Sequence, residues 1–147
     1  MRRVVVGVDG SEGSVRALEW AAQEARLRHL PLEIVLVWHP SPLVYGGTSW
    51  TAMSNTVFDD LRKDAEVRLD AACAAAGAAL DDLEVERKVV EGSAAQVLVE
   101  AAAGAELLVV GSRGRGGFAE LLLGSVSAQC AHHSPCPVLI VPRRASR

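Results

Sequence analysis

Short apolar runs, separated by segments with helical periodicity, constrain the fold of this chain more than any other feature. Four of the five runs are nearly continuous in Val, Leu and Ile, which is typical of strands buried on both faces of a parallel sheet. The remaining run, residues 84–90, alternates polar and apolar side chains, so we expect it at the wetter edge of the sheet. The predicted strands are residues 3–8, 32–38, 84–90, 107–110 and 138–141.

Helical patterns fill the intervals between these strands. After the first strand, Ser11 or Ser14 can cap a helix in which apolar residues recur at helical spacing. A longer helix is predicted over residues 56–76, where an apolar stripe faces inward and charged residues face outward. Ser93 and Gln96 form a capping-box pattern before a third helix, and a fourth follows the last glycines.

The β-α-β-α-β-α-β-α-β order predicts one open parallel sheet with helices on both faces, an α/β fold. In such folds ligands bind beyond the carboxyl ends of the strands, where the strand order reverses. Two turns expected at that edge contain informative residues: Asp9-Gly10 after the first strand and residues 111–117 after the fourth. These turns are neighbours if the strand order is 3-2-1-4-5, and the site hypothesis depends on that order.

The turn after the fourth strand opens the pattern Gly-x2-Gly-x9-Gly-Ser, from Gly111 and Gly114 to Gly124 and Ser125. Glycine lets the backbone approach a ligand closely and adopt positive φ. The helix expected after Ser125 adds exposed N–H groups and a favourable dipole, so the segment predicts a seat for phosphate. A Walker A loop needs a terminal Gly-Lys-Ser/Thr, and a dinucleotide fingerprint needs Gly-x-Gly-x-x-Gly after the first strand. The sequence has neither.

Length, charge and cysteine content narrow the remaining possibilities. At 147 residues the chain is expected to form a single domain, residues 1–147. The net charge of −3 argues against a nucleic-acid partner. The longest uncharged span, residues 34–58, is interrupted by Pro and Gly and is unlike a membrane helix. Three cysteines without framework spacing, and no evident signal peptide, favour a reducing, cytoplasmic location.

Three segments together resemble the universal stress protein family, in its ATP-binding subclass. They are Val-Val-Gly-Val-Asp-Gly-Ser at residues 5–11, the glycine motif, and Pro-Val-Leu-Ile-Val-Pro at residues 137–142. The resemblance covers nearly the whole chain. It implies an open five-stranded parallel sheet of strand order 3-2-1-4-5, which is Rossmann-like and similar to the adenine nucleotide alpha hydrolases.

The resemblance also implies which residues hold the nucleotide. In the family the glycine loop and the start of the next helix surround the triphosphate. An acid after the first strand lies near the ribose or the metal-bound phosphates, and the ends of the first two strands flank the adenosine. The matching positions are Gly111, Ser112, Arg113, Gly114, Arg115, Gly116 and Gly117 in the loop, Gly124, Ser125 and Val126 at the helix start, Asp9 as the acid, and Gly7 and Val37 beside the adenosine.

Simpler interpretations stand beside these assignments. Gly111 and Gly114 can serve a tight turn, and Asp9 can be a turn or capping residue. Arg113 and Arg115 can be ordinary surface charges.

Two kinds of chemistry find little support in the sequence. The closely spaced Cys130, His133 and Cys136 suggest a metal site, but zinc sites usually draw on paired ligand sets separated by a longer loop, so we expect no metal there. The sequence has no Gly-x-Ser-x-Gly elbow, and we assign no catalytic residue.

The expected function is therefore that of an ATP-binding regulator in a stress response, with Mg²⁺ as the expected companion of ATP. Phosphoryl transfer needs a placed metal and a group that orients the nucleophile. Asp9 could help to bind the metal, but no second carboxylate or base stands out around the loop, so at most weak hydrolysis is expected. The alternatives are a slow Mg²⁺-dependent ATPase or phosphotransferase and a nucleotide-free dimeric interaction module. By resemblance, two copies pair through the last strand, residues Val138–Val141, and an unidentified protein partner reads the bound state.

Overall fold

The fold is one five-stranded parallel sheet. The computed structural model describes residues 2–39, 55–113 and 123–143. The sheet order is β3-β2-β1-β4-β5, so the predicted order 3-2-1-4-5 is confirmed. The strands are β1 Val4–Val8, β2 Leu32–Trp38, β3 Val85–Glu91, β4 Leu107–Gly111 and β5 Val138–Val141.

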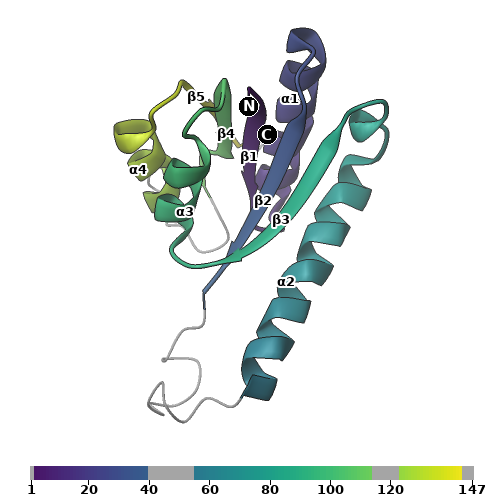
Figure 1. Ribbon diagram of the computed structural model, residues 1–147, viewed down its shortest axis with the longest axis vertical. Coiled ribbons are helices and arrows are strands. Elements are labelled where there is room, and N and C mark those ends of the chain that lie inside the picture. The colour runs from purple at the N-terminus through teal and green to yellow at the C-terminus, as the bar shows by residue number, and fades with distance from the viewer. Residues whose placement is uncertain (1, 40–54, 114–122, 144–147) are drawn as a thin grey trace.

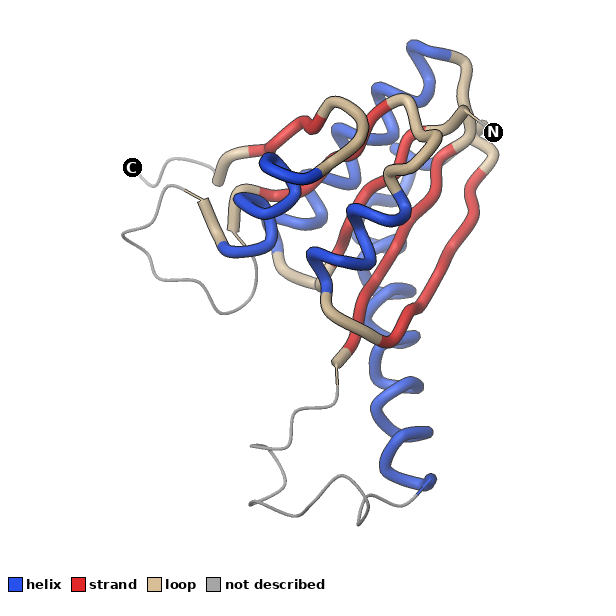
Figure 2. The backbone as a smooth tube through the Cα atoms, turned by 60° about the vertical axis from the view of Figure 1, so that its left-hand side comes forward, coloured by secondary structure: helices blue, strands red, loops and turns tan. Residues whose placement is uncertain are grey.

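Helices cover both faces of the sheet, as the element order predicts. Helices α1 and α2 lie on one side and α3 and α4 on the other (Figures 1 and 2). A short 3₁₀ turn, η3, follows α2, and its first residue, Gly77, has a φ of 53°. The bounds are α1 Glu12–Arg28, α2 Asn55–Ala76, η3 Gly77–Leu80, α3 Ala94–Ala101 and α4 Ser125–His133.

Two apolar cores result from the alternation of side chains along the strands. On β1, Val4, Val6 and Val8 face the core under α1 and α2, whereas Val5 faces the core under α3 and α4. Because both sets are buried, the run has no polar alternation. The outer strand β3 has an exposed pattern, as its mixed composition predicts for an edge strand.

One local prediction is wrong. Ser93 is the N-cap of α3, but its side chain makes no capping bond. The side-chain amide of Gln96 donates to Glu100 Oε1 at 3.3 Å, one turn further along the helix, instead of reaching back to the cap.

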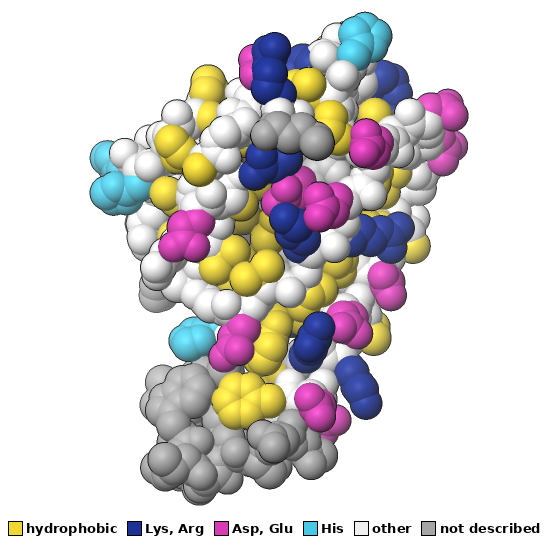
Figure 3. Space-filling view, in the orientation of Figure 1, with side chains coloured by type: hydrophobic (Ala, Val, Ile, Leu, Met, Phe, Trp, Pro, Cys, Tyr) yellow, Lys and Arg dark blue, Asp and Glu magenta, His cyan; other side chains and the backbone are white. Residues whose placement is uncertain are grey.

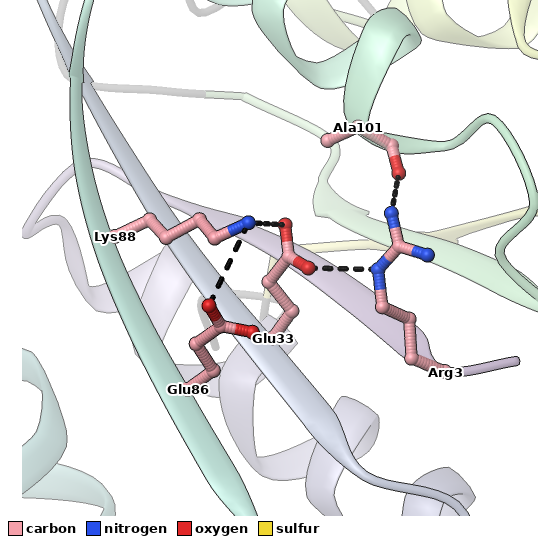
Figure 4. Close-up of polar contacts among 5 residues, drawn as sticks. All are labelled: Arg3, Glu33, Glu86, Lys88 and Ala101. Carbon is pink, nitrogen blue, oxygen red and sulfur yellow. Dashed lines mark hydrogen bonds and ion pairs between the residues drawn. The ribbon is translucent and has the colours of Figure 1, made fainter. Parts of the chain in front are cut away.

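A charged cluster connects β1, β2, β3 and α3 (Figure 4). The carboxylate of Glu33 is buried on β2, where Arg3 Nε donates to it at 2.7 Å and Lys88 Nζ lies 3.5 Å away. Arg3 also donates to the carbonyl of Ala101 at 2.7 Å, and Lys88 also pairs with Glu86 at 3.7 Å. Acidic and basic side chains gather near the middle of the face in Figure 3. Because Arg3 and Glu33 lie where β1 and β2 begin, the cluster fixes the amino ends of these strands, opposite the predicted ligand edge.

Candidate functional site

The first requirement of the site hypothesis is that β1 and β4 are neighbours. They pair in parallel, with Val4 opposite Leu107 and Val6 opposite Val109. Their carboxyl ends therefore meet at one edge, and the Asp9 turn lies beside the Ser112 turn. The adjacency on which the prediction depended is confirmed.

The turn after β1 is closed by its own side chains. Asp9 Oδ1 accepts a hydrogen bond from the Ser11 amide at 2.9 Å. Ser11 is the N-cap of α1, and its Oγ accepts from the Ser14 amide at 3.2 Å. The buried Ser14 hydroxyl donates back to the Ser11 carbonyl at 2.9 Å. Asp9 thus fills the turn role that was one of its two interpretations, and the Ser11 side chain caps the Ser14 amide in the first turn of α1.

The turn after β4 joins the two halves of the glycine motif. Ser112 is buried, and its amide donates to the Val141 carbonyl of β5 at 2.8 Å. The Ser112 carbonyl accepts from the Gly124 amide at 2.6 Å and from Ser127 Oγ at 2.8 Å. Residues far apart in the motif therefore form one unit at the ends of β4 and β5.

Helix α4 begins at this unit, and its N-cap residue supplies no capping side chain. The N-cap is Gly124, which has no side chain to accept bonds from the first-turn amides. The first amide with a partner in the helix is that of Ala128, which donates to the Gly124 carbonyl at 3.0 Å. The amides of Ser125, Val126 and Ser127 precede it and have no acceptor within the helix. Together with the helix dipole, they favour an anion at this end of α4.

Close packing, against backbone at Gly111 and against a leucine side chain at Gly7, favours glycine at two positions of the motif segments. A Cβ on Gly111 would lie 3.2 Å from the Gly13 carbonyl oxygen, because the end of β4 packs against the start of α1. A Cβ on Gly7 would lie 2.7 Å from Leu98 Cδ1, because α3 crosses β1 there. Both positions thus have a packing reason for glycine, whatever ligand approaches them.

Three predicted contact residues face the same side of the sheet. Gly7 lies under Leu98 of α3, and Val37 and Val126 pack against the core cluster that contains Leu98 and Cys130. The backbone at these positions therefore borders the α3–α4 side of the carboxyl edge. Any ligand that contacts all three has to lie on that side.

The Universal stress protein family pattern matches residues 1–142. The chain belongs to this family. A Mycobacterium tuberculosis universal stress protein is 35% identical over 147 residues, covering 96% of this chain and 48% of the relative. A Mycobacterium bovis universal stress protein is 35% identical over 145 residues, covering 94% of this chain and 47% of the relative. The chain thus spans about half the length of these relatives.

Solved structures of the family share the fold. A universal stress protein in complex with cAMP is 34% identical, has a TM-score of 0.70, and the match covers 95% of this chain and 96% of that one. A universal stress protein of Archaeoglobus fulgidus is 23% identical, has a TM-score of 0.72, and the match covers 96% of this chain and 98% of that one.

Part of the family motif falls outside the described residues. Gly114, Arg115, Gly116 and Gly117 lie there, so their predicted phosphate contacts remain predictions. Arg113 is the last described residue before them and is half-buried. Its carbonyl oxygen would lie 3.5 Å from a Cβ on Gly13, so this part of the loop also rests on α1.

The Cys-His-Cys segment does not gather into a ligand set. Cys130 is fully buried in the core under α3 and α4, whereas His132 and His133 are exposed. Burial raises the pKa of the Cys130 thiol, which disfavours the thiolate that binds metals. In the described part of the chain, no three His, Cys, Asp or Glu residues come together as metal ligands. No helix there is both long and apolar enough to cross a bilayer.

A groove of about 620 Å³ lies between α1 and α2. Its charged residues are of both signs, Glu12 and Glu19 with Arg16 and Arg143, and alanines of α2 line the opposite wall. A polyanion would meet no concentrated positive charge there. This groove is therefore a poor match for the predicted phosphate site, which lies at the start of α4.

Proposed function

We propose that this chain binds ATP, with Mg²⁺, at the carboxyl edge of β1 and β4 and acts as a regulator through its nucleotide-bound state. The observation that carries the proposal is the unit formed by Ser112, Gly124 and Ser127, from which α4 begins at an N-cap glycine that has no capping side chain. A helix start of this kind stabilises phosphate through its amides and its dipole.

Each part of the nucleotide has residues suited to it. The phosphates face the amides of Ser125 and Val126 and the Ser125 hydroxyl, with Arg113 on the neighbouring turn. The adenosine lies on the α3–α4 side, against the backbone of Gly7 and Val37.

The chemistry of Asp9 fits Mg²⁺, which binds proteins through one or two carboxylates and takes phosphate oxygens and water as its other ligands. The bond from the Ser11 amide orients this carboxylate at the edge where the phosphates are proposed to lie. When bound, Mg²⁺ supplies positive charge that offsets the charge of the phosphates.

The comparison with the cAMP complex supports an adenine nucleotide and also raises a second candidate. That neighbour is 34% identical over nearly the whole chain, and its ligand is a cyclic nucleotide. A cyclic nucleotide has one phosphate diester and no terminal phosphates. If the start of α4 and Asp9 both contribute to binding the terminal phosphates, the affinity for ATP is therefore expected to exceed that for cAMP.

Fast hydrolysis does not fit the described site. The next carboxylate after Asp9 belongs to Glu12, which lines the groove between α1 and α2. Asp9 is the one carboxylate that we assign to the site, and we assign no second acid that would orient water. We expect at most slow turnover, and metal-dependent turnover that Asp9→Ala removes while ATP binding persists would favour the slow ATPase instead.

We also propose that two copies pair through β5. This strand is the outer edge of the sheet, and Val138, Leu139 and Ile140 are only half-buried in a single chain. An apolar edge strand exposes unpaired backbone groups that another copy can cover. The two mycobacterial relatives are about twice as long as this chain, which is consistent with a two-unit assembly.

Calorimetry with ATP, ADP, AMP and cAMP, each with and without Mg²⁺, tests the proposal. We expect saturable ATP binding that Mg²⁺ strengthens. Gly114→Asp, which adds a carboxylate in the loop, is expected to abolish binding while the circular dichroism spectrum stays unchanged. No binding of any adenine nucleotide at millimolar concentration would leave the nucleotide-free interaction module as the explanation.

A further inference from the structure

The Ser127 hydroxyl makes a contact outside its own helix. Ser127 is 2% exposed, in the first turn of α4. Its Oγ lies 3.1 Å from the Gly124 carbonyl in its own turn and 2.8 Å from the carbonyl of Ser112, fifteen residues earlier. One side chain thus joins the helix start to the end of β4.

This hydroxyl is engaged within the protein. A serine hydroxyl has one proton, and two carbonyl oxygens lie within reach of it. The Ser112 carbonyl also accepts the Gly124 amide at 2.6 Å, so two donors from the α4 side meet one carbonyl of the loop. Ser127 therefore presents no hydroxyl proton to a ligand, and its effect on a ligand is indirect.

We infer that Ser127 is a positioning residue that sets the spacing between the β4 turn and the start of α4, and thereby the affinity for the phosphate part of the nucleotide. The inference rests on the proposed function. The phosphate oxygens are proposed to accept bonds from donors of the β4 turn and of the α4 start at the same time. If the spacing between these two segments varies, all of these bonds are therefore weakened together. The adenosine lies against β1 and β2, whose positions do not depend on this joint.

The size of the effect follows from what is removed. Ser127→Ala deletes one buried hydroxyl and leaves the Ser112 carbonyl with a single donor from α4. We expect ATP affinity to fall about tenfold, which is the effect of one lost hydrogen bond that orders a binding site. Adenosine affinity is expected to stay within about twofold of wild type.

Ser134 offers a matched control at the other end of the same helix. Its hydroxyl donates to the Cys136 carbonyl at 2.8 Å, which is also a serine-to-backbone bond. Ser134→Ala therefore removes a serine-to-backbone bond just beyond the C-terminus of α4 without touching the joint, and we expect unchanged affinity for both ligands. Ser127→Thr restores a hydroxyl that a helix can direct to the same carbonyls, and is expected to recover part of the ATP affinity.

The experiment measures how ATP and adenosine displace a fluorescent ATP analogue from wild type, Ser127→Ala, Ser127→Thr and Ser134→Ala, below the unfolding temperature of each. A selective loss of ATP affinity in Ser127→Ala alone supports the inference. Equal losses of affinity for ATP and adenosine would mean that Ser127 only stabilises the fold, which would overturn the inference. Unchanged ATP affinity in Ser127→Ala would overturn it as well. Failure of wild type to bind the analogue would instead refute the proposed function and remove the basis of the inference.

Discussion

Helices α1 and α4 begin at the same edge of the sheet but finish their first turns differently. Helix α1 has Ser11 as N-cap, with the Asp9 carboxylate bonded to the Ser11 amide. Helix α4 has Gly124 as N-cap, and glycine has no side chain that could accept a bond from the first-turn amides. At the α1 start the Ser11 side chain accepts the Ser14 amide, whereas Gly124 offers no such acceptor at the α4 start. This difference favours α4 over α1 as the start that would bind an anion.

Both helix starts nevertheless contain the same kind of hydrogen bond from a serine. Each has a buried serine at the third helical position whose hydroxyl returns to the N-cap carbonyl: Ser14 to Ser11 at 2.9 Å and Ser127 to Gly124 at 3.1 Å. Only Ser127 reaches beyond its own turn, to the carbonyl of Ser112 in the turn after β4. The same side chain thus stabilises a local cap in one helix and a long-range joint in the other.

Closing the α4 start with a charge is expected to have the largest effect on binding. Gly124→Glu places a carboxylate where phosphate is proposed to lie, and two like charges about 4 Å apart repel by about 4 kcal/mol near a protein surface. We expect ATP affinity to fall at least about a hundredfold by calorimetry. An acid at a helix start is favourable for the helix itself, so folding persists.

The control for this variant is Gly124→Gln, which has nearly the same size and no charge. Its loss of affinity is expected to be much smaller. Equal losses in both variants would point to a steric cause and not to an anion site.

Forcing α1 and β4 apart is expected to have the largest effect on stability. Gly111→Val puts a side chain against the Gly13 carbonyl, which a Cβ alone would approach to 3.2 Å. We expect the free energy of unfolding in urea to fall by about 1–3 kcal/mol. Gly111→Ala should cost less, and a valine variant as stable as wild type would show that this contact is not tight.

Removing one hydroxyl from each helix start separates their roles. Ser11→Ala removes the cap of α1 and is expected to lower the free energy of unfolding by about 1 kcal/mol with little change in ATP affinity. Ser125→Ala is expected to lower ATP affinity about tenfold, because a hydrogen bond to a charged group is lost, with little change in stability. The reverse pattern, in urea unfolding and calorimetry, would mean that the ligand lies at α1.

A charge pair away from both starts is expected to have the smallest effect. The hydrogen bond from Arg2 lowers the pKa of Glu106 from its ordinary value of 4.5. A lowered pKa stabilises the fold above pH 4.5, and this contribution is lost as the pH falls through the lower value of the folded state. Because the pair is exposed, Glu106→Gln should change urea unfolding only slightly at pH 7, and less as the pH falls below 4.5. A large effect at pH 7 would contradict the exposed geometry.

Most of the fold could be predicted because it depends on patterns that are local in sequence. Apolar runs such as Val4–Val8 mark buried strands, and the right-handed connection rule then limits the topology. The Ser93 prediction failed because a capping box depends on side-chain rotamers, and Gln96 has a competing partner in Glu100. The burial of Glu33 also escaped prediction, since its partners Arg3 and Lys88 come from two other strands.

The arrangement of the turns around the candidate site was also predictable, whereas the ligand contacts assigned there stay predictions. The glycine motif located the turn after β4 and the start of α4, and the strand order placed Asp9 beside them. No sequence pattern indicates the bond from Ser127 to Ser112, because a serine in the first turn of a helix is common and its acceptor lies fifteen residues away. Contacts of this kind depend on how two elements pack, which the order of residues alone does not specify.

The most direct test of the difference between the two helix starts is an NMR titration of the ¹⁵N-labelled chain with Mg²⁺ and ATP. We expect large changes in the chemical shifts of the Ser125 and Val126 amides, and much smaller changes for the Gly13 and Ser14 amides in the first turn of α1. Saturable ATP binding that changes the chemical shifts of the α1 amides and leaves those of the α4 amides unchanged would contradict the proposed phosphate site.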